Sequence, residues 1–102
     1  MAYEIEFAPA AERAFDKLSP QVRAQLSPVI EDLAVTPRPR TAVKLGDVER
    51  YGCYRVRSGS YRVIYVVMDE VVLVLVTQVG HRREVYRRFR EAAEKAIRDR
   101  RP

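Results

Sequence analysis

The sequence predicts a single α+β domain with the element order β-α-α-β-β-β-α and a mostly antiparallel, twisted sheet. Three observations lead to this fold class. Strand patterns occur at the start of the chain and again in its second half. Apolar residues recur at helical spacing over residues 11–33 and near the C-terminus. A chain of 102 residues suits one domain, residues 1–102, with its own core.

The first half of the chain predicts one strand followed by a helical hairpin on one face of the sheet. Residues 3–7 alternate apolar and acidic side chains, as in a strand with one wet face. Residues 11–18 then carry an apolar stripe at helical spacing. Ser19 and Pro20 suit the N-cap and the first position of a second helix. Because Pro28 falls inside that helix, we expect it to kink or divide the helix.

The second half predicts three strands and a C-terminal helix. Residues 36–42 hold two prolines and predict a loop, after which strands are expected at "CYRVR", "YRVIYVVM" and "VVLVLVTQV". The last of these is apolar on both faces, which indicates a strand inside the sheet and covered on both sides. From about Arg82 an apolar stripe predicts one helix, with residues from about 97 to 102 as a frayed tail.

Composition and charge narrow the location and the partners. The single cysteine, Cys53, excludes an internal disulfide, and the N-terminal residues lack the pattern of a secretion signal. The apolar run at residues 71–76 is too short to cross a bilayer. The net charge is +5, and residues 51–102 hold 12 Lys or Arg against 6 Asp or Glu. We therefore expect a cytoplasmic protein without membrane contact, whose second half attracts polyanions.

Three arginines on the predicted hairpin "YRVRSGSYRVIY" form the candidate binding site. Arg55 and Arg57 are two residues apart, so they point to one face of their strand. A two-residue turn at Gly59-Ser60 pairs Arg57 with Arg62 and places all three on one face, whereas a three-residue turn moves Arg62 to the other face. Glycine first in a two-residue loop is typical of a type II′ turn, which favours the shared face. Unless nearby acids pair with these arginines, their mutual repulsion predicts a site for a polyanion.

The stretch "CYRVRSGSYRVIYVVMDEVVLVLVTQVGHRREVY", with the helical hairpin ahead of it, resembles the RelE family of toxins from type II toxin–antitoxin pairs. The resemblance implies a compact α+β fold, cleavage of mRNA in the A site of the 70S ribosome, and a cognate antitoxin that silences the toxin. It places the family's site residues on Arg55, Arg57, Arg62, Arg82 and Tyr86. In the best-studied members lysines stand at the first two positions, and the segment before the tyrosine is longer.

Metal-free cleavage of RNA uses the 2′-hydroxyl, which attacks the adjacent phosphorus and leaves a 2′,3′-cyclic phosphate and a 5′-hydroxyl. Arginine stabilises the added negative charge but stays protonated, so it is a poor proton carrier. Proton transfer therefore falls to His81, Tyr86 or Glu84, and these alternatives stay open. Arg83 and Arg87 are further candidates for phosphate binding. We expect no cofactor and no metal, because the sequence holds no His/Cys cluster.

Two other functions fit the same sequence. A ParE-like toxin poisons DNA gyrase by binding and needs no phosphate site, and a non-catalytic RNA-binding relative would have lost the chemistry. The predicted convergence of the arginines on Tyr86 favours mRNA cleavage. We further expect the antitoxin to occupy the exposed sheet face and the apolar stripe of the C-terminal helix, through apolar contacts and acidic side chains. The sequence leaves the homo-oligomeric state open.

Overall fold

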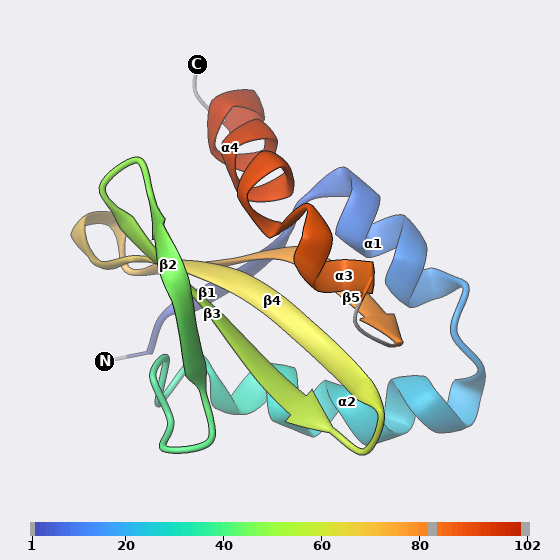
Figure 1. Ribbon diagram of the computed structural model, residues 1–102. Helices are drawn as coiled ribbons and strands as arrows, with labels where there is room; N and C mark the ends of the chain where they lie inside the picture. The colour runs from blue at the N-terminus through green and yellow to red at the C-terminus, as the bar shows by residue number, and fades with distance from the viewer. Residues whose placement is uncertain (1, 82–83, 101–102) are drawn as a thin grey trace.

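A five-stranded sheet with helices on both faces forms the protein, which confirms the predicted α+β class (Figure 1). The computed structural model describes residues 2–81 and 84–100. In chain order the elements are β1 (Glu4–Phe7), α1 (Pro9–Asp16), α2 (Pro20–Asp32), β2 (Val43–Val48), β3 (Tyr51–Ser58), β4 (Tyr61–Met68), the 3-10 helix η1 (Asp69–Val71), β5 (Leu73–His81), α3 (Glu84–Arg87) and α4 (Phe89–Arg100). None of the described helices is long and apolar enough to cross a membrane.

The strands lie in the order β1-β5-β4-β3-β2, and only the β1–β5 pair is parallel. Strand β5 has a neighbour on each side, as its continuous apolar run predicts. The edge strand β2 is absent from the predicted order, which is therefore one strand short. Its sequence "VKLGDV" is interrupted by Lys44, Gly46 and Asp47, and its register with β3 shifts between Lys44 and Gly46. Pairing with β3, rather than a local pattern, makes this segment a strand.

Helix α2 begins as the sequence predicts and continues through its proline. The side chain of Ser19 accepts a hydrogen bond from the backbone N–H of Val22 at 3.3 Å, and Pro20 follows as the first helical residue. Of the two outcomes expected at Pro28, a kink or a division, the division does not occur, because α2 runs as one helix from Pro20 to Asp32. Loss of a single ladder hydrogen bond at Pro28 does not outweigh the burial of Leu26 and Ile30 on either side of it.

The C-terminal region forms two helices instead of the expected one. Helix α3 ends at Arg87 and α4 begins at Phe89. Ile97 is 2% exposed, and the Nε of Arg100 donates to the carboxylate of Glu6 at 3.0 Å, so the expected tail is packed helix as far as Arg100. The apolar stripe of α4 is buried in the chain's own core rather than free for an antitoxin; its buried members are Ala93, Ala96 and Ile97.

The two faces of the central strands are covered by different helices. Val56, Val63 and Tyr65 share one face and are buried in the core together with residues of α2. The hydroxyl of Tyr65 donates to the carbonyl of Pro37 at 2.7 Å, which ties the loop after α2 to the sheet. Helix α4 lies over the other face (Figure 1). The part of that face nearest the β3–β4 turn lies beside the short helix α3.

Candidate functional site

The β3–β4 hairpin places three arginines on one face of the sheet. Arg57 lies opposite Arg62, and Ser58 lies opposite Tyr61, so the turn contains only Gly59 and Ser60. Gly59 has a φ of +61°, as the first position of a type II′ turn requires. The predicted two-residue turn is therefore confirmed. It follows that Arg62 shares a face with Arg57 and with Arg55, two residues earlier on β3.

Tyr86 of α3 lies over this face and completes the group. The Nε of Arg62 donates to the Tyr86 hydroxyl at 2.5 Å. The guanidinium carbons of Arg55 and Arg62 lie 5.8 and 5.3 Å from the centre of the Tyr86 ring, within the range of cation–π attraction. Because α3 follows β5 after a short connection, its tyrosine folds back over β4 and β3. We call Arg55, Arg57, Arg62 and Tyr86 the arginine–tyrosine cluster.

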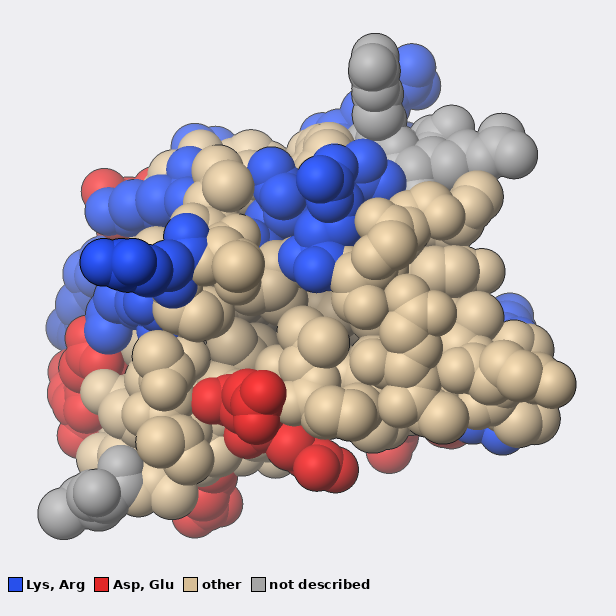
Figure 2. Space-filling model, turned by 90° about the horizontal axis from the view of Figure 1, so that it is seen from below, with Lys and Arg blue, Asp and Glu red and all other residues tan. Residues whose placement is uncertain are grey.

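No carboxylate of the described residues forms an ion pair with the arginines of the cluster. Two acids that follow β4 in the sequence, Asp69 and Glu70, are engaged elsewhere. Asp69 pairs with Arg38 at 2.6 Å, and hydrogen bonds from Arg38 and then Tyr3 hold the pKa of Asp69 below its usual value. Glu70 pairs with Arg50 at 2.8 Å. The positive charge of the cluster is therefore not neutralised by these acids. Figure 2 shows one face of the molecule, on which most Lys and Arg side chains gather in the upper part of the view and most Asp and Glu side chains in the lower part.

The cluster presents hydrogen-bond donors suited to an anion. Arg62 uses two of its nitrogens inside the protein, one for Tyr86 and one for the carbonyl of Ser60 at 3.1 Å. Its remaining N–H groups, and those of the exposed Arg57, are available to a ligand. The Nε of Arg55 is buried and has no hydrogen-bond partner. Guanidinium groups bind phosphate oxygens in a fork geometry, so the arrangement can hold a phosphodiester and stabilise charge that develops on it.

His81 is not brought together with the cluster. It lies opposite Tyr61 at the end of β5, and the two rings are 5.0 Å apart. Because Tyr61 precedes Arg62 on one strand, the two residues point to opposite faces of the sheet. The histidine therefore lies on the face of α2, whereas the cluster lies on the face of α3. Its role in proton transfer stays a prediction that this position does not favour.

The other predicted site residues belong to the segment after β5. Arg82 and Arg83 lie outside the described residues, as does the side chain of Glu84. Arg87 is exposed on α3, one residue after Tyr86, and is available for contact with a polyanion. The described part of the site therefore contains four of the predicted residues close together, and Arg87 follows one of them in the sequence.

Gln78 is a residue near the site that the sequence analysis missed. It lies opposite Ile64, which in turn lies opposite Arg55, so the three form one row across the sheet. The side-chain oxygen of Gln78 is buried and has no hydrogen-bond partner. The signal in the sequence is a polar residue within the apolar run "VVLVLVTQV".

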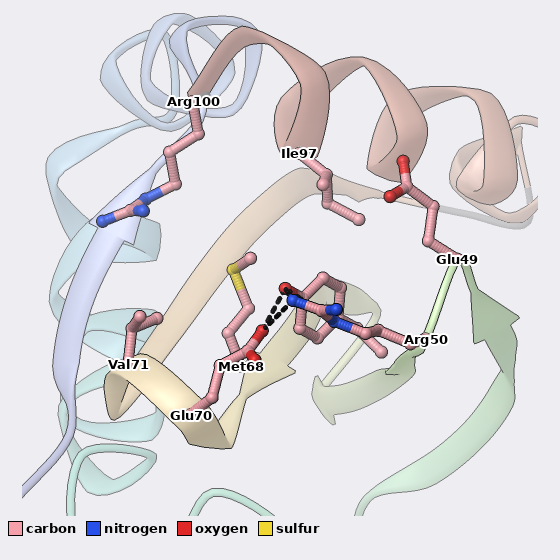
Figure 3. A pocket seen from close by; sticks show the side chains of 8 residues that line it. Glu49, Arg50, Met68, Glu70, Val71, Ile97 and Arg100 are labelled. Atoms are coloured by element: carbon pink, nitrogen blue, oxygen red, sulfur yellow. Dashed lines mark hydrogen bonds and ion pairs between the residues drawn. The ribbon is translucent and has the colours of Figure 1, made fainter. Parts of the chain in front are cut away.

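A separate cavity of about 780 Å³ lies at the other end of the sheet, between η1, the β2–β3 turn and α4 (Figure 3). Figure 3 shows Arg50 and Glu70 pointing toward one another across it, with Ile97 of α4 above. None of its lining residues belongs to the arginine–tyrosine cluster. This cavity is apolar at Met68 and Val71 and has mixed charge at its rim, so it does not resemble a phosphate site.

The described residues offer no alternative catalytic centre based on a metal or a thiol. No group of three or more His, Cys, Asp or Glu side chains in this part of the chain could hold a metal ion. Cys53 is buried, and this burial raises the pKa of its thiol to about 12. Because the thiolate is the reactive form, Cys53 is a packing residue rather than a nucleophile.

Known proteins are similar to this chain in sequence and in fold. Residues 5–86 match the family described as "ParE toxin of type II toxin-antitoxin system, parDE". The toxin RelG of Mycobacterium tuberculosis is 33% identical over 91 residues, which cover 86% of this chain and 100% of RelG. The mRNA interferase toxin RelE of Escherichia coli K12 is 37% identical over 90 residues, which cover 84% of this chain and 92% of RelE.

Solved structures agree with these matches. The isolated Escherichia coli RelE toxin has a TM-score of 0.70 at 30% identity, covering 96% of this chain and 98% of its own. The toxin in the archaeal RelE–RelB complex from Pyrococcus horikoshii OT3 has a TM-score of 0.71 at 25% identity, covering 80% of this chain and 97% of its own. The chain therefore belongs to the RelE family of toxins from type II toxin–antitoxin systems, within the superfamily that includes ParE.

Proposed function

We propose that this protein is a toxin that cleaves mRNA on the ribosome as a metal-independent endoribonuclease and so inhibits translation. The observation that supports the proposal most is the arginine–tyrosine cluster. Its three arginines share one sheet face and form no ion pair with a described carboxylate. Arg55 and Arg62 lie against the ring of Tyr86, and Arg62 donates to its hydroxyl. A phosphodiester under attack needs such an environment. The similar Escherichia coli RelE carries the name mRNA interferase toxin.

In the proposed reaction the 2′-oxygen bonds to phosphorus while the bond from phosphorus to the 5′-oxygen breaks. The products are a 2′,3′-cyclic phosphate and a 5′-hydroxyl, so one proton leaves the 2′-oxygen and one reaches the 5′-oxygen. Arg55 and Arg57 hold the phosphate oxygens, and Arg62 stabilises the additional negative charge. Tyr86 carries one of the proton transfers, because its hydroxyl accepts from Arg62 and, as a phenol, can also donate a hydrogen bond. From the family pattern, Arg82 joins the phosphate site.

A cognate antitoxin is the proposed protein partner, and the ribosome presents the mRNA. Support for the antitoxin comes from the related RelE proteins, which were crystallised with RelB. The net charge of +5 and the arginine-rich second half favour association with the polyanionic ribosome at a rate that falls with salt. The arginines of the cluster form no ion pair with a described carboxylate, so an acidic antitoxin segment bound there would also block the site.

Inhibition of DNA gyrase is the second candidate function. It is favoured by the description of the matched family, which names the ParE toxin. A protein that acts on gyrase by binding alone has no need for three arginines on one sheet face with a tyrosine against two of them. The cluster therefore favours RNA cleavage, and the two functions predict different damage in a cell.

Induction of the protein in a bacterium, followed by mapping of new mRNA 5′ ends, tests the proposal. The variants are Arg62→Ala, which removes a cluster guanidinium, and Arg50→Ala, which removes an exposed guanidinium at the separate cavity. We expect new cuts within translated frames for the wild type and for Arg50→Ala, and their loss in Arg62→Ala. Growth arrest with intact mRNA and damaged DNA would identify gyrase as the target. Growth without arrest or new mRNA ends would support a non-catalytic relative.

A further inference from the structure

The polar side chains of the cluster can bind the hydrogen-bond acceptors of a nucleotide but not its hydrogen-bond donors. Arginine can only donate hydrogen bonds, and a phosphate diester can only accept them. The ribose 2′-hydroxyl and the amino and imino groups of the bases are donors, and they need an acceptor. The Tyr86 hydroxyl already accepts from Arg62. A site that binds RNA through this cluster therefore lacks a free acceptor, unless a neighbouring residue supplies one.

Gln78 lies where such an acceptor is needed. Gln78 on β5 lies in line with Ile64 on β4 and Arg55 on β3. The next line of residues on the same sheet face consists of Arg57, Arg62 and Gly80. Gln78 and Arg62 therefore point to the same face of the sheet, from neighbouring strands. Gly80, which lies opposite Arg62, has no side chain that could separate them. The side chain of Gln78 thus projects on the sheet face that carries the cluster rather than on the face of α2.

The amide oxygen of Gln78 and the Nε of Arg55 are the described side-chain atoms that are buried without a hydrogen-bond partner. Both belong to one row of one sheet face. The adjacent residue provides a contrast, because Thr77 is also buried, yet its hydroxyl donates to the carbonyl of Ile64 at 3.2 Å. A polar residue of β5 can therefore be satisfied within the fold, and Gln78 is not. A buried acceptor left unpaired destabilises a protein, so it calls for an explanation, and a role in function is one such explanation.

We propose that Gln78 is a substrate-binding residue, whose amide oxygen accepts a hydrogen bond from an N–H or O–H donor of the nucleotide held by the cluster. This inference rests on the proposed RNA cleavage. The oxygen is covered in the free chain, and rotation about the last side-chain torsion, which is broad for glutamine, changes its direction at little cost. Pairing with the substrate would orient the ribose or base while the arginines hold the phosphate.

The test compares Gln78→Leu, which removes the amide at similar size, with Thr77→Val, which removes the satisfied hydroxyl next to it. Two quantities are measured for each variant: the single-turnover cleavage rate on ribosomes programmed with a defined mRNA, and the midpoint of thermal unfolding. We expect Gln78→Leu to cleave about tenfold more slowly, with an unfolding midpoint equal to or above that of the wild type. Thr77→Val should cleave at the wild-type rate and unfold at a lower temperature.

A second arm identifies the donor. The base 5′ of the cut is varied among A, C, G and U, and the rate ratio of wild type to Gln78→Leu is measured for each mRNA. A ratio that changes with the base assigns the hydrogen bond to the base, and a ratio that is equal for all four assigns it to the ribose hydroxyl. Either pattern supports the inference.

Three results would overturn it. If the wild type cleaves and Gln78→Leu cleaves equally fast, Gln78 does not contact the substrate, and the proposed function stands. If Gln78→Leu is slower but unfolds at a lower temperature, as Thr77→Val does, Gln78 has a structural role. If the wild type does not cleave mRNA on ribosomes, the proposed function fails, and the role of Gln78 fails with it.

Discussion

The Nε of Arg62 donates a hydrogen bond to the hydroxyl of Tyr86 at 2.5 Å, and this bond joins strand β4 to helix α3. The two residues are 24 positions apart in the sequence. This bond and the bond from Nη1 to the carbonyl of Ser60 fix two guanidinium nitrogens and leave the remaining N–H groups available to a ligand. It also aligns the phenolic oxygen with the positive charge. The pair therefore links charge stabilisation and proton transfer in one contact, as phosphodiester cleavage requires.

Replacement of Tyr86 by phenylalanine tests the hydroxyl by itself. Tyr86→Phe keeps the ring over Arg55 and Arg62 but removes the oxygen that accepts from Arg62. We expect the single-turnover cleavage rate on ribosomes to fall roughly 10²- to 10⁴-fold, because proton transfer is lost. Far-ultraviolet circular dichroism should match that of the wild type.

Tyr51→Phe is the matched control for Tyr86→Phe. Tyr51 also accepts hydrogen bonds from an arginine, Arg50, but at the separate cavity. Its loss should leave the cleavage rate unchanged. Equal rates for the two variants would show that the Tyr86 hydroxyl takes no part in the chemistry.

Lysine substitutions test whether the planar guanidinium group is required at Arg62 and whether a positive charge is sufficient at Arg57. Arg62 uses Nε and Nη1 for internal hydrogen bonds, which lysine cannot reproduce. Arg57 is exposed and makes no described hydrogen bond through its side chain. We expect Arg62→Lys to reduce the cleavage rate about 100-fold and Arg57→Lys to reduce it by less than about threefold. Similar losses in both variants, measured in the same single-turnover assay, would contradict this division of roles.

Local patterns in the sequence predict the parts of the fold and site that depend on neighbouring residues. The Ser19 cap, the Gly59-Ser60 turn and the interior position of β5 follow from capping, turn chemistry and apolar periodicity. The turn matters most, because one additional loop residue would have moved Arg62 to the other face. The two-residue turn at Gly59 and Ser60 thus decides whether the three arginines share one face.

The parts that local patterns do not predict depend on contacts between distant segments. Strand β2 contains Lys44, Gly46 and Asp47 and exists because β3 pairs with it. The face on which His81 lies is set by its register with Tyr61, which no property of "VGHRR" reveals. The partnerless oxygen of Gln78 becomes visible only when the neighbouring strands are in place. The sequence therefore predicts the charged residues of the candidate site but not the proposed hydrogen-bond acceptor, Gln78.

Val72 adopts a backbone conformation that its side chain disfavours. Its φ is +53°, in the left-handed region, where a β-branched residue is strained by roughly 1–2 kcal/mol. Val72→Asn should therefore raise the free energy of unfolding by about 1 kcal/mol, because asparagine tolerates this region. Urea denaturation gives the value. Val71→Asn, at a 53% exposed neighbour without a positive φ, is the control and should give no increase.

Asp69 links folding stability to acid pH. Its carboxylate accepts hydrogen bonds from Arg38 at 2.6 Å and from Tyr3 at 2.6 Å, and these contacts lower its pKa in the folded chain below the usual value of 3.8. A carboxyl group whose pKa is lower in the folded than in the unfolded state binds protons more readily when unfolded. Its contribution to stability is therefore complete above about pH 4 and is lost as the pH falls through the lowered pKa.

Asp69→Asn removes this contribution and provides the measurement. At pH 7 the variant should unfold at lower urea concentration than the wild type, since Arg38 and Tyr3 lose a charged partner. The gap should shrink as the pH falls below about 4 and close once the pH lies below the lowered pKa, where the wild-type carboxyl is also protonated. Asp32→Asn, at an exposed carboxylate with no described ion pair, should follow the wild-type curve throughout. A gap for Asp69→Asn that stays constant from pH 7 to pH 2 would show that the contact stabilises the fold through packing rather than charge.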